Sequence, residues 1–195
     1  MGRPKKSEGE ATRARLLHAA EIEFGAAGYD RARLEDIAAA AGIRRSSLLY
    51  YFGNKETLYR EVVATFTADL KRSIREVISL PGDAMVRLER IGALLISFAE
   101  AHKAGVAMFV RELLDSPAAG EEHIGEFVAV VDMIESFVAD EAAHLIPDGA
   151  PTRALLLHLM TSEALRIASG RLGERVWGTD AVDPLALVRA LLTQR

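Results

Sequence analysis

The residues best suited to chemistry lie in a short helix predicted over Arg45–Tyr51. At helical spacing, Leu48, Tyr51 and Phe52 fall on one apolar face. The opposite face carries the polar side chains Arg45, Ser46, Ser47 and Tyr50. Guanidinium and hydroxyl groups donate hydrogen bonds to phosphates and base edges. A helix with one buried face and one such polar face is typical of a helix that lies in a groove of duplex DNA.

Two preceding helices must position this segment. The first is predicted over Thr12–Ala26, with its apolar residues on one face, and is expected to end at Gly25 and Gly28. The second is predicted over Leu34–Ala41. Gly42 follows it, because a turn between two steeply crossing helices needs a residue that tolerates a left-handed backbone. The three segments together predict a helix-turn-helix unit.

The rest of the chain is also predicted to be helical, because alternating β patterns are missing and chain breakers recur at helix-sized intervals. A long helix is expected from Lys55 to about Leu80, before Pro81 and Gly82. Further helices are predicted over residues 83–103, 104–115, 119–145, 152–172 and 184–194, with a break from Gly170 to Gly178. The predicted fold class is therefore all-α, with about nine helices.

Charge is distributed unevenly along the 195 residues, although the formal net charge is only −4. Residues 1–60 hold eleven lysine and arginine residues against eight acidic ones, and the remainder holds thirteen against twenty. A basic head on an acidic body can reach phosphates without binding nucleic acid over its whole surface.

The composition excludes several classes of protein. Half of the residues are hydrophobic, which excludes a disordered chain, and the absence of cysteine excludes a disulfide framework and a thiolate metal site. The N-terminus leads into no apolar signal core, and no apolar stretch approaches the roughly 20 residues of a membrane span. We expect a cytoplasmic protein without a membrane partner.

One part of the sequence resembles a known family. The matching segments are Gly28-Tyr29, Leu34–Ala38, Ala41-Gly42-Ile43, Leu48–Phe52 and Asn54-Lys55-Glu56. Their order and spacing over residues 10–60 resemble the N-terminal domain of TetR/AcrR-type transcriptional regulators. The resemblance implies a homodimer that binds a double-stranded DNA operator, and a C-terminal pocket whose small-molecule effector usually releases the DNA.

The resemblance also divides the chain and assigns roles to residues. It implies a flexible basic arm over 1–11, a helix-turn-helix DNA-binding domain over 12–58, and a ligand-binding and dimerisation domain over 59–195. Arg45, Ser46 and Ser47 stand where the recognition helix of the family touches DNA, Tyr50 stands in a slot often set against the DNA backbone, and Lys55 stands where a phosphate is usually held. The arm residues Arg3, Lys5 and Lys6 either enter an A·T-rich minor groove or form a disordered, solubilising start.

Three positions depart from the family pattern. Arg33 and Arg44 stand where hydroxyl residues usually cap the second and third helices, and a lost cap costs about 1 kcal/mol. Leu49 replaces a common phosphate-contacting tyrosine. Our hypothesis is that the two arginines bind phosphate or guanine in place of that tyrosine, so both belong to the predicted DNA-binding set.

The body of the chain is rich in large apolar residues, for which core packing is the default explanation. Helical sensors line ligand cavities with such residues and a few polar groups. The candidate pocket consists of Phe66, Leu94, Phe98, His102, Met108, Arg111, Glu112, Met133, Phe137, Met160 and Glu163.

Two late segments carry more apolar surface than a single packed face requires, which predicts a further partner. With the resemblance, that partner is the second subunit, in a four-helix interface. The candidate interface residues are Leu155, Leu159, Ile167, Leu187 and Leu191. Two-fold symmetry then predicts a near-palindromic operator with half-site centres about 34–36 Å apart, or multiples of that distance.

Two alternatives to a ligand-controlled repressor remain open. One is a DNA-binding protein without ligand control, and the other is a small helical metal protein or enzyme. Glu141-x-x-His144 is one half of a di-iron helix-bundle signature, but a second such pair is missing. Since no phosphate loop, nucleophile elbow or paired-carboxylate cluster stands out either, we expect no catalytic residues, no metal and no cofactor.

Overall fold

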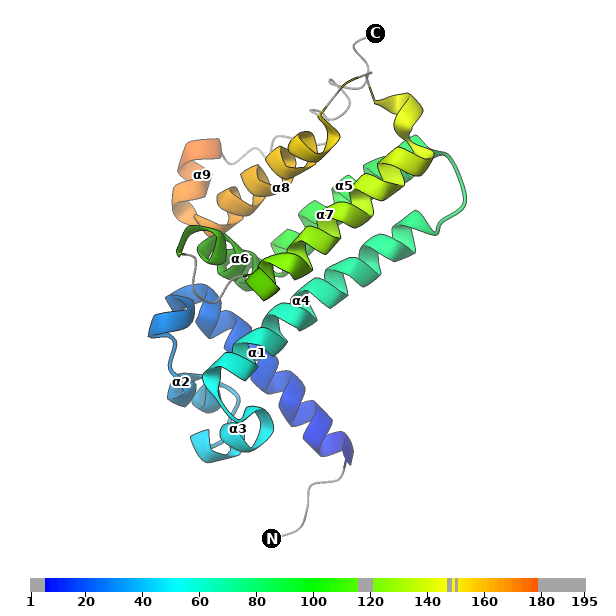
Figure 1. The fold of residues 1–195 in the computed structure, drawn as a ribbon. Helices are drawn as coiled ribbons and strands as arrows, with labels where there is room; N and C mark the ends of the chain where they lie inside the picture. Colours follow the sequence, from blue (N-terminus) through cyan, green and yellow to red (C-terminus); the bar gives the residue numbers. More distant parts are fainter. Residues whose placement is uncertain (1–5, 116–120, 147–148, 150, 179–195) are drawn as a thin grey trace.

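The computed structural model describes residues 6–115, 121–146, 149 and 151–178 (Figure 1). Within these residues the secondary structure consists of nine α-helices and one 3-10 helix, which confirms the all-α prediction. The helices are α1 (Lys6–Arg31), α2 (Leu34–Ala40), α3 (Arg45–Phe52), α4 (Lys55–Ile78), α5 (Ala84–Ala101), α6 (Lys103–Asp115), α7 (Glu121–Glu141), α8 (Thr152–Ala168) and α9 (Arg171–Trp177), with the 3-10 helix η1 (Ala143–Leu145) after α7.

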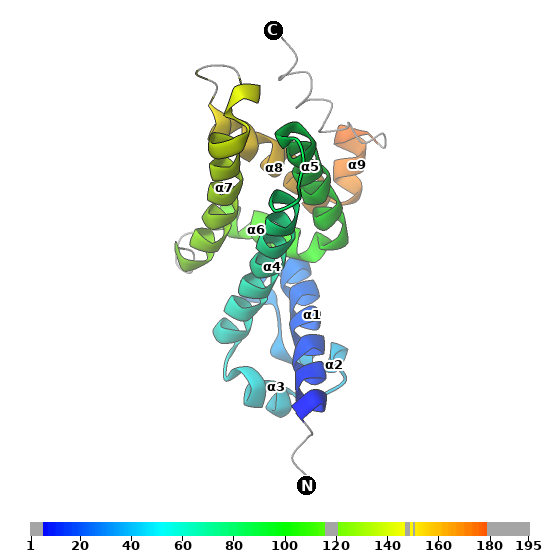
Figure 2. The same cartoon turned by 90° about the vertical axis from the view of Figure 1, so that its right-hand side faces the viewer.

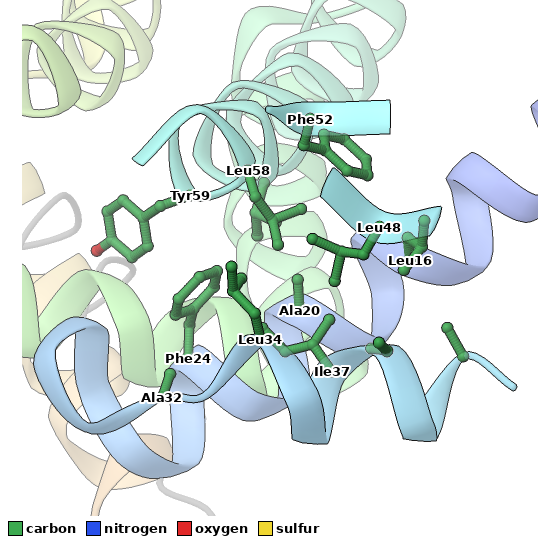
Figure 3. Packing of buried hydrophobic residues seen from close by; sticks show 14 of the residues in the cluster. Leu16, Ala20, Phe24, Ala32, Leu34, Ile37, Leu48, Phe52, Leu58 and Tyr59 are labelled. Atoms are coloured by element: carbon green, nitrogen blue, oxygen red, sulfur yellow. The ribbon is translucent and has the colours of Figure 1, made fainter. Parts of the chain in front are cut away.

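Helices α1 to α3 and the start of α4 form the head of the molecule around one apolar core (Figure 3). Leu16, Phe24, Ile37, Leu48 and Leu58 are fully buried in it. Each comes from the apolar face that helical spacing predicts, so these faces meet in a single cluster.

Gly42 makes the turn between α2 and α3 as predicted, with a φ of 71°. The amide of Ile43 donates to the carbonyl of Ala38 at 2.9 Å, and that of Gly42 donates to Ala39 at 3.0 Å. These two bonds form a Schellman motif, which requires a left-handed residue at this position.

Helix α1 is longer at both ends than predicted. It begins at Lys6 rather than at Thr12, so residues 6–11 of the predicted flexible arm are part of the helix. It also continues through Gly25 to Arg31, across a kink at Gly28 where φ is 78° and ψ is 166°. Gly25 remains helical because it packs against α6, a long-range contact that local sequence signals cannot reveal.

Helix α4 runs from the head into the body, which consists of the rest of α4 and helices α5 to α9, as Figures 1 and 2 show. Asn54 caps its N-terminus by accepting a hydrogen bond from the Thr57 amide at 2.8 Å. In the body, α4 packs with α5 and α7 around a second apolar cluster, which includes Ile74, Ile91 and Ile134. Helix α6 is the part of the body that packs against α1 of the head.

The C-terminal half differs from the prediction in two respects. Helix α7 ends at Glu141, and the 3-10 helix η1 occupies the end of the segment predicted as one helix to residue 145. Helix α8 ends at Ala168, and the short helix α9 occupies the segment that was predicted to be a break. Gly170 turns the chain with a φ of 52°, and Gly173 lets α9 approach the backbone of α8 at Arg166, where a side chain would collide. The predicted helix over residues 184–194 lies outside the described residues.

No single helix in the described ranges is long and apolar enough to cross a membrane. The consecutive helices Ala84–Ala101 and Lys103–Leu114 are long and apolar enough for a membrane span only when taken together, and the angle between them is 96°.

Candidate DNA-binding face and effector cavity

Helix α3 presents the polar face that its sequence predicts. Arg45, Ser46 and Ser47 are exposed, and the Tyr50 side chain is 82% exposed. On the opposite side Leu48 and Phe52 are buried, while Tyr51 is half-buried. A ring as exposed as that of Tyr50 stabilises the core very little, so the α3 surface is available to a partner.

Arg45 is held in place by a neighbour on α2. Its Nε lies 3.0 Å from Oε1 of Glu35 across the helix-turn-helix corner. Both side chains are about half exposed, so the ion pair adds little to stability, although it restrains the guanidinium beside the exposed face.

The two helices of the motif begin without side-chain caps, as predicted. Arg33 occupies the N-cap position of α2 and Arg44 that of α3, and neither side chain bonds to a backbone amide. Both are exposed on the head. Neither arginine therefore acts as a helix cap, and both are exposed where the hypothesis of DNA contact requires them.

Replacing Arg44 with serine tests this hypothesis with two readouts of opposite sign. The serine hydroxyl can cap α3, so the free energy of unfolding should rise by about 1 kcal/mol, measured by urea denaturation. Operator affinity should fall by roughly tenfold or more, because an arginine contact contributes about 1–3 kcal/mol. If operator affinity stays unchanged while stability rises, Arg44 does not contact DNA.

Lys55 is already engaged within the head. Its Nζ donates to the carbonyl of Asp30 at 3.1 Å and lies 4.8 Å from the ring centroid of Tyr29. The lysine thereby ties the start of α4 to the end of α1. Its predicted contact with a DNA phosphate stays a prediction.

The arm residues Arg3 and Lys5 lie outside the described residues, as does the side chain of Lys6. Their predicted minor-groove contact therefore stays a prediction.

The body contains a partly open apolar cavity of about 170 Å³ among α4, α5, α6, α7 and α8. The predicted pocket residues that line it are Phe66, Phe98, Met160 and Glu163. Leu155 and Leu159, predicted for the dimer interface, also line it. Most of the remaining wall is aliphatic or aromatic, so the cavity suits a largely apolar ligand.

The other predicted pocket residues do not line this cavity. Leu94, Met133 and Phe137 pack in the body core instead, with the Phe137 ring beneath the Arg87 guanidinium at 5.1 Å. Met108 and Glu112 line a smaller cavity of about 30 Å³ that shares Phe66 with the large one. Helical periodicity identifies apolar faces, but it cannot show which side chains fill the space between helices and which border a gap.

His102 and Arg111 were also predicted to anchor a ligand, and they lie instead at the junction of head and body. The His102 ring stacks on Phe98 at 4.3 Å, and its Nδ1 lies 3.8 Å from Oε1 of Glu21 on α1. Arg111 donates to the carbonyls of Gly25 and Ala26, each at 3.2 Å. Arg111 connects α6 to α1, His102 at the end of α5 also contacts α1, and neither side chain borders the cavity.

Glu21 caps a helix of the body from within the head. Its Oε1 accepts a hydrogen bond from the Gly105 amide at 3.1 Å, in the first turn of α6. The first amides of a helix have no partner within the helix, and a carboxylate there also interacts favourably with the helix dipole. Glu21 could not be predicted from the sequence, because a cap from a residue 84 positions away leaves no local signal.

Helices α1 and α6 approach closely because glycine lies on each side. A Cβ atom on Gly25 would lie 2.5 Å from the carbonyl oxygen of Ala104. A Cβ atom on Gly105 would lie 2.5 Å from the Phe66 ring, which borders the large cavity. The cavity wall and the head–body junction therefore share one packed contact.

A second link between head and body joins α4 to α6. The Tyr59 hydroxyl donates to Oε2 of Glu112 at 2.6 Å. Burial, the hydrogen bond to Glu112 and the charge of that carboxylate all raise the pKa of Tyr59, so its hydroxyl stays protonated and remains the donor. The Tyr59 ring packs edge-on against Phe24 and Tyr29, each at 5.0 Å between centroids.

Glu163 is fixed beside the cavity by Arg166, one turn later on α8. Arg166 Nε donates to both carboxylate oxygens of Glu163, at 3.1 and 3.0 Å, and its Nη2 donates to Oε1 of Glu100 at 2.6 Å. Hydrogen bonds to Glu163 and Glu100 raise the pKa of Arg166. Hydrogen bonds from Lys103 and Arg166 lower the pKa of Glu100. Arg166 was not among the residues predicted for the pocket.

The predicted dimer residues do not form an exposed set. Ile167 is 8% exposed and belongs to the packing of its own chain, while Leu187 and Leu191 lie outside the described residues. The apolar side chains exposed on α8 and α9 are Leu165, Leu172 and Val176. On α8, the predicted Leu155, Leu159 and Ile167 and the exposed Leu165 all belong to the apolar circumference of the helix, and only the packing decides which of them face inward.

Fold and surface together define a helix-turn-helix DNA-binding protein whose head is joined to a helical body with an apolar cavity. The family model described as bacterial regulatory proteins of the tetR family matches residues 16–62. The HTH-type transcriptional regulator YdgC of Bacillus subtilis is 27% identical over 149 residues, which cover 66% of this chain and 74% of that protein. The HTH-type transcriptional repressor KstR2 of Rhodococcus jostii is 31% identical over 101 residues, 52% of this chain and half of that protein.

The likeness extends to the fold of the body. The structure of the regulator FadR from Bacillus subtilis in complex with stearoyl-CoA aligns with a TM-score of 0.67 over 92% of this chain and 95% of that one, at 17% identity. The match over residues 16–62 places the helix-turn-helix domain of the head in the tetR family, and the curated relatives named above are HTH-type transcriptional regulators.

Proposed function

We propose that this regulator is a repressor that binds a near-palindromic operator as a dimer and leaves it when a small molecule occupies the body cavity. The observation that carries the proposal is that one chain holds both an exposed polar face on α3, suited to DNA, and an apolar cavity of about 170 Å³. A DNA-binding protein without ligand control has no need of such a cavity.

The contacts of α6 provide the route from cavity to DNA-binding head. A ligand between α4 and α5 presses on Phe66 and Phe98, and these rings contact Gly105 and His102 respectively. Glu21 on α1 faces both Gly105 and His102. A ligand changes operator affinity only through its different affinity for the two conformations, typically by about 1–3 kcal/mol of coupling.

The relatives support repression and a lipophilic effector. KstR2 of Rhodococcus jostii is named as a repressor, and FadR of Bacillus subtilis was solved with stearoyl-CoA. The cavity of this chain is lined mostly by aliphatic and aromatic side chains, which favours a lipophilic effector here also.

Dimerisation is supported by the apolar surface of α8 and α9. Leu165, Leu172 and Val176 are 43%, 64% and 66% exposed. Exposed apolar residues gathered on adjacent helices are typical of a protein interface, and a second copy of the chain is the partner that a two-fold operator requires.

The test is a footprint of the purified regulator on the DNA beside its own gene. We expect a protected site with two-fold symmetry and half-site centres about 34–36 Å apart, or a multiple of that distance. Asymmetric protection, or no protection at any concentration, would contradict the proposal.

Replacing Tyr50 with alanine should weaken binding to that site by roughly thirtyfold. The reason is that each half-site loses one hydrogen bond of about 1 kcal/mol, and 1.4 kcal/mol is tenfold in affinity. Fluorescence anisotropy with the footprinted duplex measures the change. Val86, 44% exposed on α5 of the body, provides the matched control, and Val86→Ala should bind like the parent protein. If Tyr50→Ala and Val86→Ala bind the duplex with equal affinity, Tyr50 on α3 does not contact DNA.

A further inference from the structure

Glu163 is the one charged side chain among the described residues that border the large cavity. The rest of that wall is apolar except for Thr152. Glu163 lies on α8, and its side chain is 19% exposed. A carboxylate in an otherwise apolar wall determines which polar group a ligand can bring into the cavity.

The cations near Glu163 are already used. Arg166 donates to Glu163 and to Glu100, and Lys103 Nζ lies 2.8 Å from the other oxygen of Glu100. Two carboxylates and two cations thus form a balanced cluster. Neither Arg166 nor Lys103 borders the cavity, so an anionic ligand would meet the Glu163 carboxylate without a free cation to pair with.

Glu163 keeps acceptor capacity for a ligand. A carboxylate offers about four lone-pair positions. Arg166 donates to Oε1 through both Nε and Nη2, and to Oε2 through Nε alone. One position on Oε2 is left for a further donor. Hydrogen bonds that involve charged groups are roughly twice as strong as neutral ones, so a cationic donor should bind most tightly.

The volume limits the size of the ligand. An engineered cavity of about 150 Å³ binds benzene, and this cavity measures about 170 Å³. A single aromatic ring with a short substituent therefore fits inside the cavity.

We propose that the effector is a small, mostly apolar molecule with one cationic or hydrogen-bond-donating end group, such as an arylalkylamine, and that this end group binds Glu163. The inference rests on the proposed function, because it names the class of ligand for the same cavity. The proposed effector differs from an acid or acyl ligand, for which the described residues of the wall offer no free cation.

Four probes with one ring and different end groups test the inference: 4-fluorobenzylamine, 4-fluorobenzyl alcohol, 4-fluorobenzoate and 4-fluorotoluene. Titrations of the full-length protein followed by fluorine NMR give a dissociation constant for each. We expect the amine to bind at least tenfold more tightly than fluorotoluene, the alcohol to fall between them, and the benzoate to bind most weakly.

Two variants show whether Glu163 causes the order. Glu163→Gln should abolish the tenfold advantage of the amine while fluorotoluene binds as before. Glu135→Gln is the matched control, because Glu135 lies on α7 in an ion pair with Arg153 and does not border the cavity. It should leave the order unchanged.

The outcomes separate the two proposals. If fluorotoluene binds but the amine has no advantage, or if benzoate binds most tightly, the inference about Glu163 is overturned and the ligand cavity stands. If none of the four probes binds the folded protein, the cavity is not a ligand site, and the effector part of the proposed function fails together with the inference.

Discussion

Replacing Gly25 with alanine should lower the free energy of unfolding by about 2 kcal/mol, because overpacking a tight contact typically costs about 1–3 kcal/mol. The added methyl group would lie 2.5 Å from the Ala104 carbonyl oxygen and 2.9 Å from its Cα. Both atoms belong to the backbone of α6, which cannot move aside as a flexible side chain can. Urea denaturation followed by circular dichroism measures the change.

Gly9 provides the matched control on the same helix. It is helical like Gly25, but nothing lies within 4 Å of the position that its Cβ would occupy. Gly9→Ala should therefore stabilise the protein by about 0.5–1 kcal/mol, the usual gain for alanine over glycine in a helix. If Gly25→Ala stabilises the protein as Gly9→Ala does, α1 and α6 do not approach each other closely at Gly25 and Ala104.

Gly25→Ala should also weaken operator binding, since the contact that it disturbs joins the DNA-binding head to the body. Arg111 holds the same turn of α1 through the Gly25 and Ala26 carbonyls, so a shift of α6 reaches the end of α1 directly. Anisotropy titrations with the footprinted duplex, under conditions where the variant is fully folded, separate this effect from the loss of stability.

Replacing Tyr59 with phenylalanine should destabilise the protein by about 1.5–3 kcal/mol, the range for a hydrogen bond to a charged group. The phenylalanine ring keeps the edge-on contacts with Phe24 and Tyr29 and loses only the hydroxyl that donates to Glu112. Since Tyr59 belongs to α4 and Glu112 to α6, the variant also weakens the second link between head and body. Thermal and urea unfolding measure the loss.

Tyr51→Phe is the control for this prediction. Tyr51 is half-buried in the same head and keeps its ring contacts with Tyr50 and Phe52 in the variant. Its unfolding free energy should change by less than about 0.5 kcal/mol, as for most surface substitutions. A loss in Tyr51→Phe equal to that in Tyr59→Phe would show that the Glu112 hydrogen bond is not the cause.

The head could be predicted from the sequence almost completely, because its determinants are local. Helical spacing predicts that Leu48 and Phe52 are buried and that Tyr50 is exposed, and Gly42 marks the turn. The missing caps at Arg33 and Arg44 could also be read directly. Each of these features depends on residues within about one or two helical turns of each other, and such short separations leave a pattern in the sequence.

The cavity and the junction were decided by the tertiary structure. The sequence predicted a pocket of large apolar residues with a few polar groups and included Phe66, Phe98, Met160 and Glu163 in it, but it could not separate these from Leu94, Met133 and Phe137. All seven lie on apolar helix faces. Only the packing of five helices determines which faces leave a gap.

The contacts of His102, Arg111 and Ile167 could not be predicted for the same reason. The sequence shows whether each side chain is polar or apolar, but not which distant residues it meets. Glu21 and Gly105 are 84 positions apart, and Arg111 and Gly25 are 86 apart. By itself the sequence determined which side chains the helices of the head turn inward and, to within one residue, where α2 and α3 end. Which helices meet, and therefore which residues bind, brace or border the cavity, depends on long-range contacts that appear only when the chain is folded.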